Sequence, residues 1–266
     1  MGLAVCATPI GNLDDVTLRV LIELREADVV LGEDTRHTRV LLDRHGIKAR
    51  LLSYHEHNEA KRVAEVLPRL QAGERVALVS DAGLPGISDP GARLIAASLD
   101  AGVPVTVLPG PSSVETALVA SGIAADRYQF VGFLPRGSKA LQAFWKELST
   151  WGHPVVAFES PRRLPATLRS LAESDPERLV AVCRELTKKF EEIVRGPAAQ
   201  VAARFPEPPR GEITLVIGPS SVGADVHAAV DAVAELVAAG VSRRQAADVV
   251  ARLTGAGRNQ LYRRTL

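Results

Sequence analysis

Three glycine- and proline-rich segments have the composition of ligand-binding loops, and each follows a strand-like run of aliphatic residues. They are residues 8–12, 81–91 and 108–113. Glycine lets the backbone approach a ligand closely, and proline fixes the path of the chain. Segment 81–91 is longer than the roughly two to six residues of an ordinary βα loop, which favours a binding role. For residues 8–12 a tight turn is the simpler alternative. The dinucleotide pattern G-x-G-x-x-G and the P-loop pattern are absent from the sequence, so neither type of nucleotide site is indicated.

A second feature is the pair of acids Glu33 and Asp34, which follows another aliphatic run and precedes Arg36. Asp34 is typical of a helix N-cap, in which case Glu33 and Arg36 are solvated. Alternatively, a carboxylate at this position accepts a proton or binds substrate. Both interpretations stay open at this point.

Two histidines and two glutamates gather in residues 54–59, which invites comparison with a zinc site. The spacing of His55, Glu56 and His57 does not match the zinc-binding pattern H-E-x-x-H, and no cysteine lies nearby. Polar substrate contact or the plain start of a helix is therefore favoured over metal binding.

Charge is concentrated in two further places. Residues 184–192 form a charged run after a strand-like segment, which indicates either a solvated helix surface or a functional group at a strand end. The tail, residues 241–266, carries six arginines and the single acid Asp248, for a net charge of +5. Its short helical segments, divided by glycines, resemble a helix-turn-helix; they predict phosphate contact or a helical cap with a basic face.

The elements that must position these residues alternate between strand and helix, which predicts α/β architecture with mainly parallel sheets. We expect two α/β domains at 1–110 and 111–220 and a small helical tail at 225–266. Because ligands bind at the carboxyl ends of such strands, the three loops should line one pocket. Predicted strands are 3–7, 28–31, 50–53, 76–80, 103–108, 128–132, 154–158, 179–183 and 213–217. Predicted helices are 15–26, 36–44, 57–72, 91–101, 112–121, 138–149, 163–173, 197–204, 226–239, 242–253 and 258–264.

Composition supports an ordinary globular chain. It has 266 residues, a net charge of +1, 46% hydrophobic and 24% charged residues. No run approaches the roughly 20 apolar residues of a membrane-spanning helix, and the N-terminus lacks the features of a signal peptide. Cys6 and Cys183 both lie in apolar runs, which indicates two buried thiols in a reducing cytoplasm.

Eight motifs occur in one order along the whole chain: TPIGN (8–12), EDTR (33–36), YHEHNE (54–59), DAGxPxISDPG (81–91), LPGPSS (108–113), GFLPR (132–136), RELTKKFEE (184–192) and RGEITLVIGP (210–219). This order resembles the small-subunit ribosomal RNA 2′-O-ribose methyltransferases of the tetrapyrrole-methylase superfamily. The resemblance implies S-adenosylmethionine (SAM) bound between two α/β domains, no metal, and a homodimer. It also implies a decoding-region cytidine of 16S rRNA, C1402, as substrate in the small ribosomal subunit.

The resemblance also implies functional residues. A 2′-hydroxyl must lose its proton to become a nucleophile, and the candidates to accept it or to stabilise the alkoxide are Asp34, Glu33, Glu185 and Lys188. Where the family usually has threonine and a larger aliphatic residue, this chain has Leu84 and Gly86. It also lacks the histidine common near residues 159–163. The expected SAM-binding residues are Thr8, Pro9, Ile10, Gly11, Ala82, Gly83, Leu84, Ile87, Ser112, Ser113, Glu159 and Leu186. The expected RNA-binding residues are Arg36, His55, His57, Arg136, Arg243, Arg244, Arg258 and Arg263.

Three other functions compete with this one. A tetrapyrrole (precorrin-type) C-methyltransferase would share the cleft, but it would leave the basic tail and the EDTR and YHEHNE segments without a purpose. A non-catalytic RNA-binding module would not need the shaped loop 81–91, and it would have no affinity for SAM. A nucleotide-binding α/β enzyme conflicts with the absence of phosphate-binding loops.

Overall fold

A computed structural model describes residues 2–123, 126–219 and 226–264. The chain folds into two compact units. One comprises Met1–Thr116 together with Leu186–Lys189, and the other comprises Ala117–Glu185 together with Phe190–Leu266. The first division falls inside helix α5 (Ser113–Ser121), a few residues beyond the predicted boundary at residue 110.

The first unit is built on a five-stranded sheet in the order β3-β2-β4-β1-β5, with every strand parallel to its neighbours. The strands are β1 (Leu3–Cys6), β2 (Val29–Gly32), β3 (Leu51–Ser53), β4 (Val76–Val79) and β5 (Val105–Leu108). Strands β1, β2 and β4 are buried along their whole length, as continuous aliphatic runs in a parallel sheet should be.

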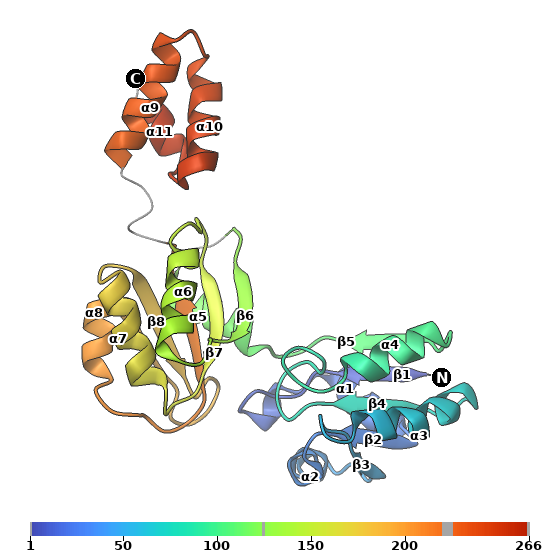
Figure 1. The fold of residues 1–266 in the computed structure, drawn as a ribbon. Helices are drawn as coiled ribbons and strands as arrows, with labels where there is room; N and C mark the ends of the chain where they lie inside the picture. The colour runs from blue at the N-terminus through green and yellow to red at the C-terminus, as the bar shows by residue number, and fades with distance from the viewer. Residues whose placement is uncertain (1, 124–125, 220–225, 265–266) are drawn as a thin grey trace. The chain divides into compact units, whose positions relative to one another are not determined.

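Helices cover both faces of this sheet (Figure 1). Alternate residues of β1 separate the two cores: Leu3 and Val5 pack with α3 and α4, and Ala4 and Cys6 pack with α1 and α2. The chain leaves β1 toward β2 and leaves the adjacent β4 toward β5, so the sheet has its switch point between β1 and β4. The helices are η1 (Leu13–Asp15), α1 (Leu18–Glu26), α2 (Thr35–Arg44), α3 (Glu59–Gln71) and α4 (Ala92–Asp100).

The second unit holds a mixed sheet in the order β6-β7-β10-β8-β9. Only β6 and β7 are parallel, and the other three pairings are antiparallel. Two α/β domains are therefore confirmed, whereas mainly parallel pairing is wrong for this sheet, because β10 inserts between β7 and β8 and β9 folds back on β8. The strands are β6 (Gln129–Phe133), β7 (Val155–Glu159), β8 (Leu179–Arg184), β9 (Glu192–Pro197) and β10 (Ile213–Ile217).

Strand β9 is absent from the sequence prediction. The charged run 184–192 is also no helix: residues 185–191 form turns, and β9 begins at the end of the run. Helices α6 (Ser138–Leu148), α7 (Leu164–Ser174) and α8 (Ala198–Arg204) pack on one face of the sheet through Trp145, Leu168 and Val201.

Both cysteines are buried and unpaired, as predicted. The Sγ of Cys183 lies 3.7 Å from the carbonyl oxygen of Ala117 in α5, on the face of the second sheet opposite α6–α8. Burial raises the pKa of each thiol to about 12, so neither is a reactive thiolate at neutral pH.

The C-terminal segment forms the predicted three helices, α9 (Val226–Ala238), α10 (Arg243–Thr254) and α11 (Arg258–Arg264). They enclose a small core of alanine, valine and leucine side chains that includes Val233, Val250 and Leu261. The Ser242 side chain caps α10, and Gly255 ends it with a left-handed φ of 73°. The residues between the predicted domain 111–220 and the predicted tail 225–266 lie outside the described ranges. Within the described ranges no helix is long and apolar enough to cross a membrane.

Candidate active site at the carboxyl edge of the first sheet

The loops that follow β1 and β4 join at the switch point. The backbone nitrogen of Thr8 donates to the carbonyl oxygen of Gly83 at 2.8 Å, and the nitrogen of Gly83 donates to the carbonyl oxygen of Thr8 at 3.1 Å. The hydroxyl of Thr8, itself buried, donates to the carbonyl oxygen of Ser80 at 3.0 Å. These bonds hold two of the three predicted binding loops against each other.

The third loop lies beside the first. A side chain at Gly110 would come within 2.9 Å of the Ala7 methyl group, so glycine is required for this approach. Beyond it, the Ser112 hydroxyl donates to the carboxylate of Glu115, and Ser113 begins α5. The structure thus brings all three loops to one edge of the sheet.

Gly83 lies where these loops meet. A Cβ at Gly83 would meet nothing closer than the Pro111 carbonyl oxygen at 3.8 Å and the Ile10 side chain at 3.9 Å. Its φ of 76° lies in the left-handed region that favours glycine. Nearby in the loop, Ile87 is 51% exposed although it is a large aliphatic residue. An exposed aliphatic side chain at this position suits contact with an apolar part of a ligand.

A distant segment also reaches this edge. Residues 186–189 belong to the first unit although the chain on either side belongs to the second. A Cβ at Gly11 would lie 2.6 Å from the carbonyl oxygen of Leu186 and 2.5 Å from the Cγ of Lys188. Glu185 and Thr187 have left-handed φ values of 53° and 63°, which are strained for residues with side chains. The sequence predicted Leu186 and Lys188 here, but it gave no sign of this strain.

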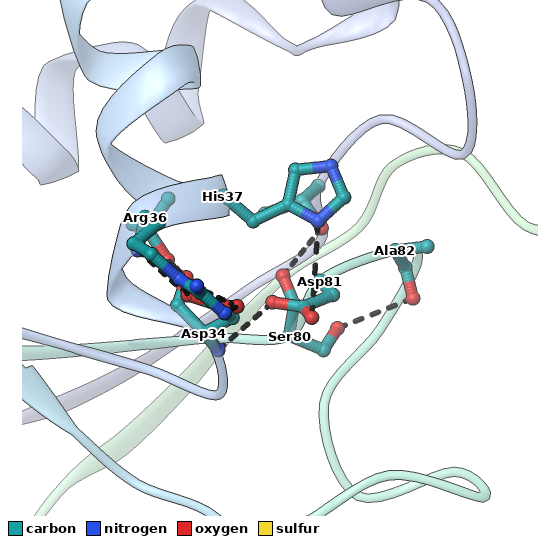
Figure 2. Close-up of polar contacts among 8 residues, drawn as sticks. Asp34, Arg36, His37, Ser80, Asp81 and Ala82 are labelled. Carbon is teal, nitrogen blue, oxygen red and sulfur yellow. Dashed lines mark hydrogen bonds and ion pairs between the residues drawn. The ribbon is translucent and has the colours of Figure 1, made fainter.

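Asp34 occupies the N-cap of α2, where its Oδ1 accepts from the Arg36 backbone nitrogen at 2.8 Å (Figure 2). The Arg36 guanidinium also pairs with its carboxylate at 2.6 Å and holds the pKa of Asp34 well below its usual range. The capping interpretation is therefore correct. A carboxylate so stabilised in its ionised form is a weak proton acceptor.

Asp81 connects the loops after β2 and β4. Its Oδ1 accepts from the backbone nitrogen of Asp34 at 3.0 Å, and its Oδ2 lies 3.8 Å from the Nδ1 of His37. Figure 2 shows the His37 ring directed toward this carboxylate. Sequence reasoning singled out the loop but not Asp81, whose partners only the tertiary structure reveals.

Glu33 and Asp89 have raised pKa values. For Glu33 the causes are burial and then the nearby charge of Asp81. For Asp89 burial is again the larger cause, followed by the charges of Glu33 and Asp81, and its pKa rises to about 6. Of the two predicted acceptors in this segment, Glu33 thus has a raised pKa and Asp34 a lowered one, which favours Glu33 as the proton acceptor. Asp89 was not predicted.

Residues 54–59 lead into α3 as the simpler interpretation expected. The Tyr54 hydroxyl donates to Glu59 at 3.0 Å, and the same Glu59 oxygen accepts from the Gly91 nitrogen at 3.0 Å. His55 Nε2 lies 3.1 Å from the Asn58 amide nitrogen, while His57 is exposed. Over the described ranges, no three histidine, cysteine, aspartate or glutamate side chains are placed to hold a metal ion.

Two predicted residues belong to the second unit and have other partners. Glu159 is buried, and its carboxylate accepts from the Ser160 nitrogen at 2.7 Å and the Thr167 hydroxyl at 2.6 Å. It also pairs with Arg163 Nε at 3.2 Å. Glu185 Oε1 accepts from the Glu212 nitrogen at 2.9 Å. Both carboxylates therefore accept hydrogen bonds that stabilise the second unit.

The predicted RNA-binding arginines differ in their availability. Arg136, which follows β6, is exposed, as are Arg244 and Arg263 in the tail. Arg258 pairs with Asp248. Arg243 is only partly exposed, and its Nε atom is buried.

Known protein families match most of this chain. Residues 2–202 match the tetrapyrrole (corrin/porphyrin) methylases, and residues 224–266 match the RsmI C-terminal HTH domain. A relative in Mesorhizobium japonicum, ribosomal RNA small subunit methyltransferase I, is 43% identical over 100% of this chain and 91% of its own length. Its namesake in Thermotoga maritima is 45% identical over 81% of this chain and 97% of its own. The chain belongs to the ribosomal RNA small subunit methyltransferase I family. It is therefore a methyltransferase, and the resemblance seen in the ordered motifs is confirmed.

Solved structures show the same fold at low sequence identity. The methyltransferase CobJ superposes with a TM-score of 0.63 at 21% identity, covering 82% of this chain and 94% of its own. A uroporphyrin-III C-methyltransferase from Thermus thermophilus, complexed with S-adenosyl homocysteine, gives 0.60 at 18% identity, covering 82% and 97%. At these identities the likeness establishes the fold alone.

Proposed function

We propose that this methyltransferase transfers a methyl group from SAM to the 2′-hydroxyl of a decoding-region cytidine in small-subunit 16S rRNA. One observation carries the proposal: the loops at 8–11 and 82–83 and the returning segment 186–188 meet at the sheet's switch point. This is the place where open α/β sheets bind ligands. The names of the relatives favour an rRNA substrate.

The residues at this edge suit SAM. The exposed Ile87 side chain offers apolar contact to an adenine ring. When bound, SAM supplies a methyl group on a positively charged sulfur that becomes a neutral thioether. The chain must therefore align the ribose hydroxyl and accept its proton.

Glu33 and Lys188 are the proposed groups for the proton. Glu33 has a raised pKa, and a carboxylate with such a pKa accepts a proton more readily than Asp34 does. The Lys188 side chain lies over Gly11, where its ammonium group would stabilise a developing alkoxide. Glu185 remains a weaker proposal because its carboxylate already binds the Glu212 nitrogen.

The RNA must be opened locally so that one nucleotide reaches the site. We assign contact with the RNA phosphate backbone to the tail, where Arg244 and Arg263 are exposed. Further contact with the RNA is assigned to Arg36, His55 and His57 at the edge of the first sheet. A homodimer and a cytoplasmic location complete the proposal, and two buried free thiols agree with the latter. Sedimentation of the purified protein tests the dimer.

The decisive experiment incubates the protein with methyl-labelled SAM and small ribosomal subunits from a strain lacking this methylation. Nuclease digestion and mass spectrometry then locate the label. A single 2′-O-methylcytidine in the decoding region is expected. Glu33→Gln and Lys188→Met should lower turnover while keeping SAM affinity. Unlabelled subunits, with SAM binding intact and a precorrin-type tetrapyrrole methylated instead, would replace the proposal with C-methylation.

A further inference from the structure

The second unit exposes an aromatic side chain that the site above does not use. Phe133, at the end of β6, is 61% exposed. Its ring meets Phe158 edge to face, with centroids 5.6 Å apart and planes at 63°. Phe130 meets the same Phe158 ring at 5.0 Å and 67°. An exposed phenylalanine on an edge strand favours association with another molecule, which indicates a contact surface.

A β-bulge determines which way Phe133 points. In the pairing of β6 with β7, Phe130 lies opposite Val156 and Phe133 lies opposite Phe158. Three residues of β6 therefore span two residues of β7, and Gly132 takes a left-handed φ of 64° at this point. In a regular strand Phe133 would share the face of Val131, which packs against the core under α6–α8. The extra residue turns Phe133 to the opposite face.

A buried ionic network fixes the residues that follow. The Arg163 guanidinium donates to the carbonyl oxygens of Leu134 at 2.9 Å and Pro135 at 2.6 Å. Arg163 is itself held by the carboxylate of Glu159, whose side chain has no exposed surface. The backbone between Phe133 and Arg136 is thus anchored to the core. Both exposed side chains leave a rigid support rather than a loose loop.

The segments that follow β6 and β7 carry exposed cations and no exposed carboxylate. Residues 134–140, which follow β6, and residues 160–170, which follow β7, include no aspartate or glutamate. Glu159, the last residue of β7, is buried and paired with Arg163. Arg136, Lys139 and Arg162 in these segments are all exposed. A two-fold contact between copies through this patch would set these cations against themselves. An anionic partner with flat rings satisfies both the cations and the phenylalanine.

We propose that Phe133, flanked by Arg136 and Arg162, is a stacking platform for an unpaired base of the substrate RNA. The ring stacks on the face of the base, and the two guanidinium groups bind the adjoining phosphates. Such a platform would hold one base of the strand unpaired. The inference rests on the proposed function, because it takes RNA as the substrate.

The test compares wild type with Phe133→Leu and Phe133→Trp. Leucine keeps an apolar side chain without an aromatic face, and tryptophan keeps the face. The readout is the Kd of each protein for a single-stranded oligonucleotide of decoding-region sequence and its KM for small subunits. We expect leucine to raise both about tenfold, tryptophan to stay within about twofold, and SAM affinity to be equal in all three. Arg136→Gln should reduce the salt dependence of RNA binding by about one released ion.

Other outcomes overturn the inference. Equal RNA affinity in wild type and Phe133→Leu removes the stacking role. An equal loss in the leucine and tryptophan variants, together with a changed sedimentation coefficient, assigns Phe133 to a contact between copies of the chain. Wild type that binds no RNA also refutes it. If wild type binds the oligonucleotide but leaves subunits unmethylated, the proposed function is contradicted. The stacking role of Phe133 is then tested by the Kd values of the variants alone.

Discussion

Replacement of the buried Glu159 should unfold the second unit more easily and leave SAM binding unchanged. The carboxylate is the common acceptor for the Ser160 nitrogen, the Thr167 hydroxyl and Arg163. Glu159→Ala leaves three donors facing a space without an acceptor. Glu159→Gln keeps the shape but loses the charge and points an amide group at other donors.

The expected loss of unfolding free energy depends on how deeply Glu159 and Arg163 are buried. Breaking a buried ion pair by removing one member costs about 3–5 kcal/mol. The Glu159 side chain is fully buried, whereas 28% of the Arg163 side chain is exposed and can be hydrated. The lower end, about 3 kcal/mol, is therefore expected for Glu159→Ala, and about 2 kcal/mol for Glu159→Gln. At roughly 2–4 °C per kcal/mol, the alanine variant should melt about 6–12 °C lower.

Tryptophan fluorescence is a suitable assay because both tryptophans, Trp145 and Trp151, lie in the second unit. Trp145 of α6 is buried, and its Nε1 donates to the hydroxyl of Ser170 in α7 at 3.0 Å. Its emission should report the melting of this unit specifically. Thr167→Val is the matched control, since it removes one neighbouring hydrogen bond and should cost about 1 kcal/mol.

A different pattern would refute this reasoning. If Glu159→Gln melts at the wild-type temperature while its Kd for SAM rises tenfold, Glu159 is a cofactor ligand rather than a structural acceptor. Titration calorimetry with SAM on both variants and on Thr167→Val distinguishes the two roles.

Three further substitutions test other parts of the molecule. Asp89→Asn should stabilise the protein by roughly 1 kcal/mol at pH 8 and not below about pH 4. The reason is that the native state raises the pKa of Asp89 to about 6 and so disfavours its ionised form at pH 8. If wild type and Asp89→Asn had equal urea midpoints at both pH values, this prediction would be contradicted. Gly11→Ala should displace segment 186–188 and lower SAM affinity and turnover at least tenfold. Gly152→Ala, whose added methyl meets only ordinary contacts, is its control, and equal behaviour of the pair argues against the displacement. Arg263→Gln should weaken RNA binding and lower its salt dependence by about one ion. Thermal melting should stay unchanged for Arg263→Gln, and an unchanged salt dependence would remove Arg263 from the interface.

Local sequence determined most of the elements. Aliphatic runs such as Val76–Val79 form strands because their side chains are buried on both faces of a parallel sheet. Asp34 and Ser242 begin their helices because each accepts a hydrogen bond from a backbone nitrogen a few residues on. The loop motifs also predicted a shared pocket, since the carboxyl ends of parallel strands lie at the same edge of the sheet.

Other features depended on partners far away in the chain. Strand β9 escaped notice because its residues, Glu192–Pro197, alternate weakly and gain their hydrogen bonds only from β8. The antiparallel place of β10 is likewise set by pairing with two strands that precede it by tens of residues. No local pattern records which strand will lie beside which.

The chemistry of single residues was also decided in three dimensions. The sequence by itself placed Glu33, Asp34 and Glu159 in interesting segments but could not rank them, because a carboxylate's role depends on its burial and partners. The tertiary structure pairs Asp34 with Arg36, buries Glu159 against Arg163, and leaves Glu33 with a raised pKa. A one-residue bulge at Gly132 similarly turns Phe133 outward. Composition and motif order thus determined the family and the edge where the site lies, and only long-range packing decided which side chains there are free to act.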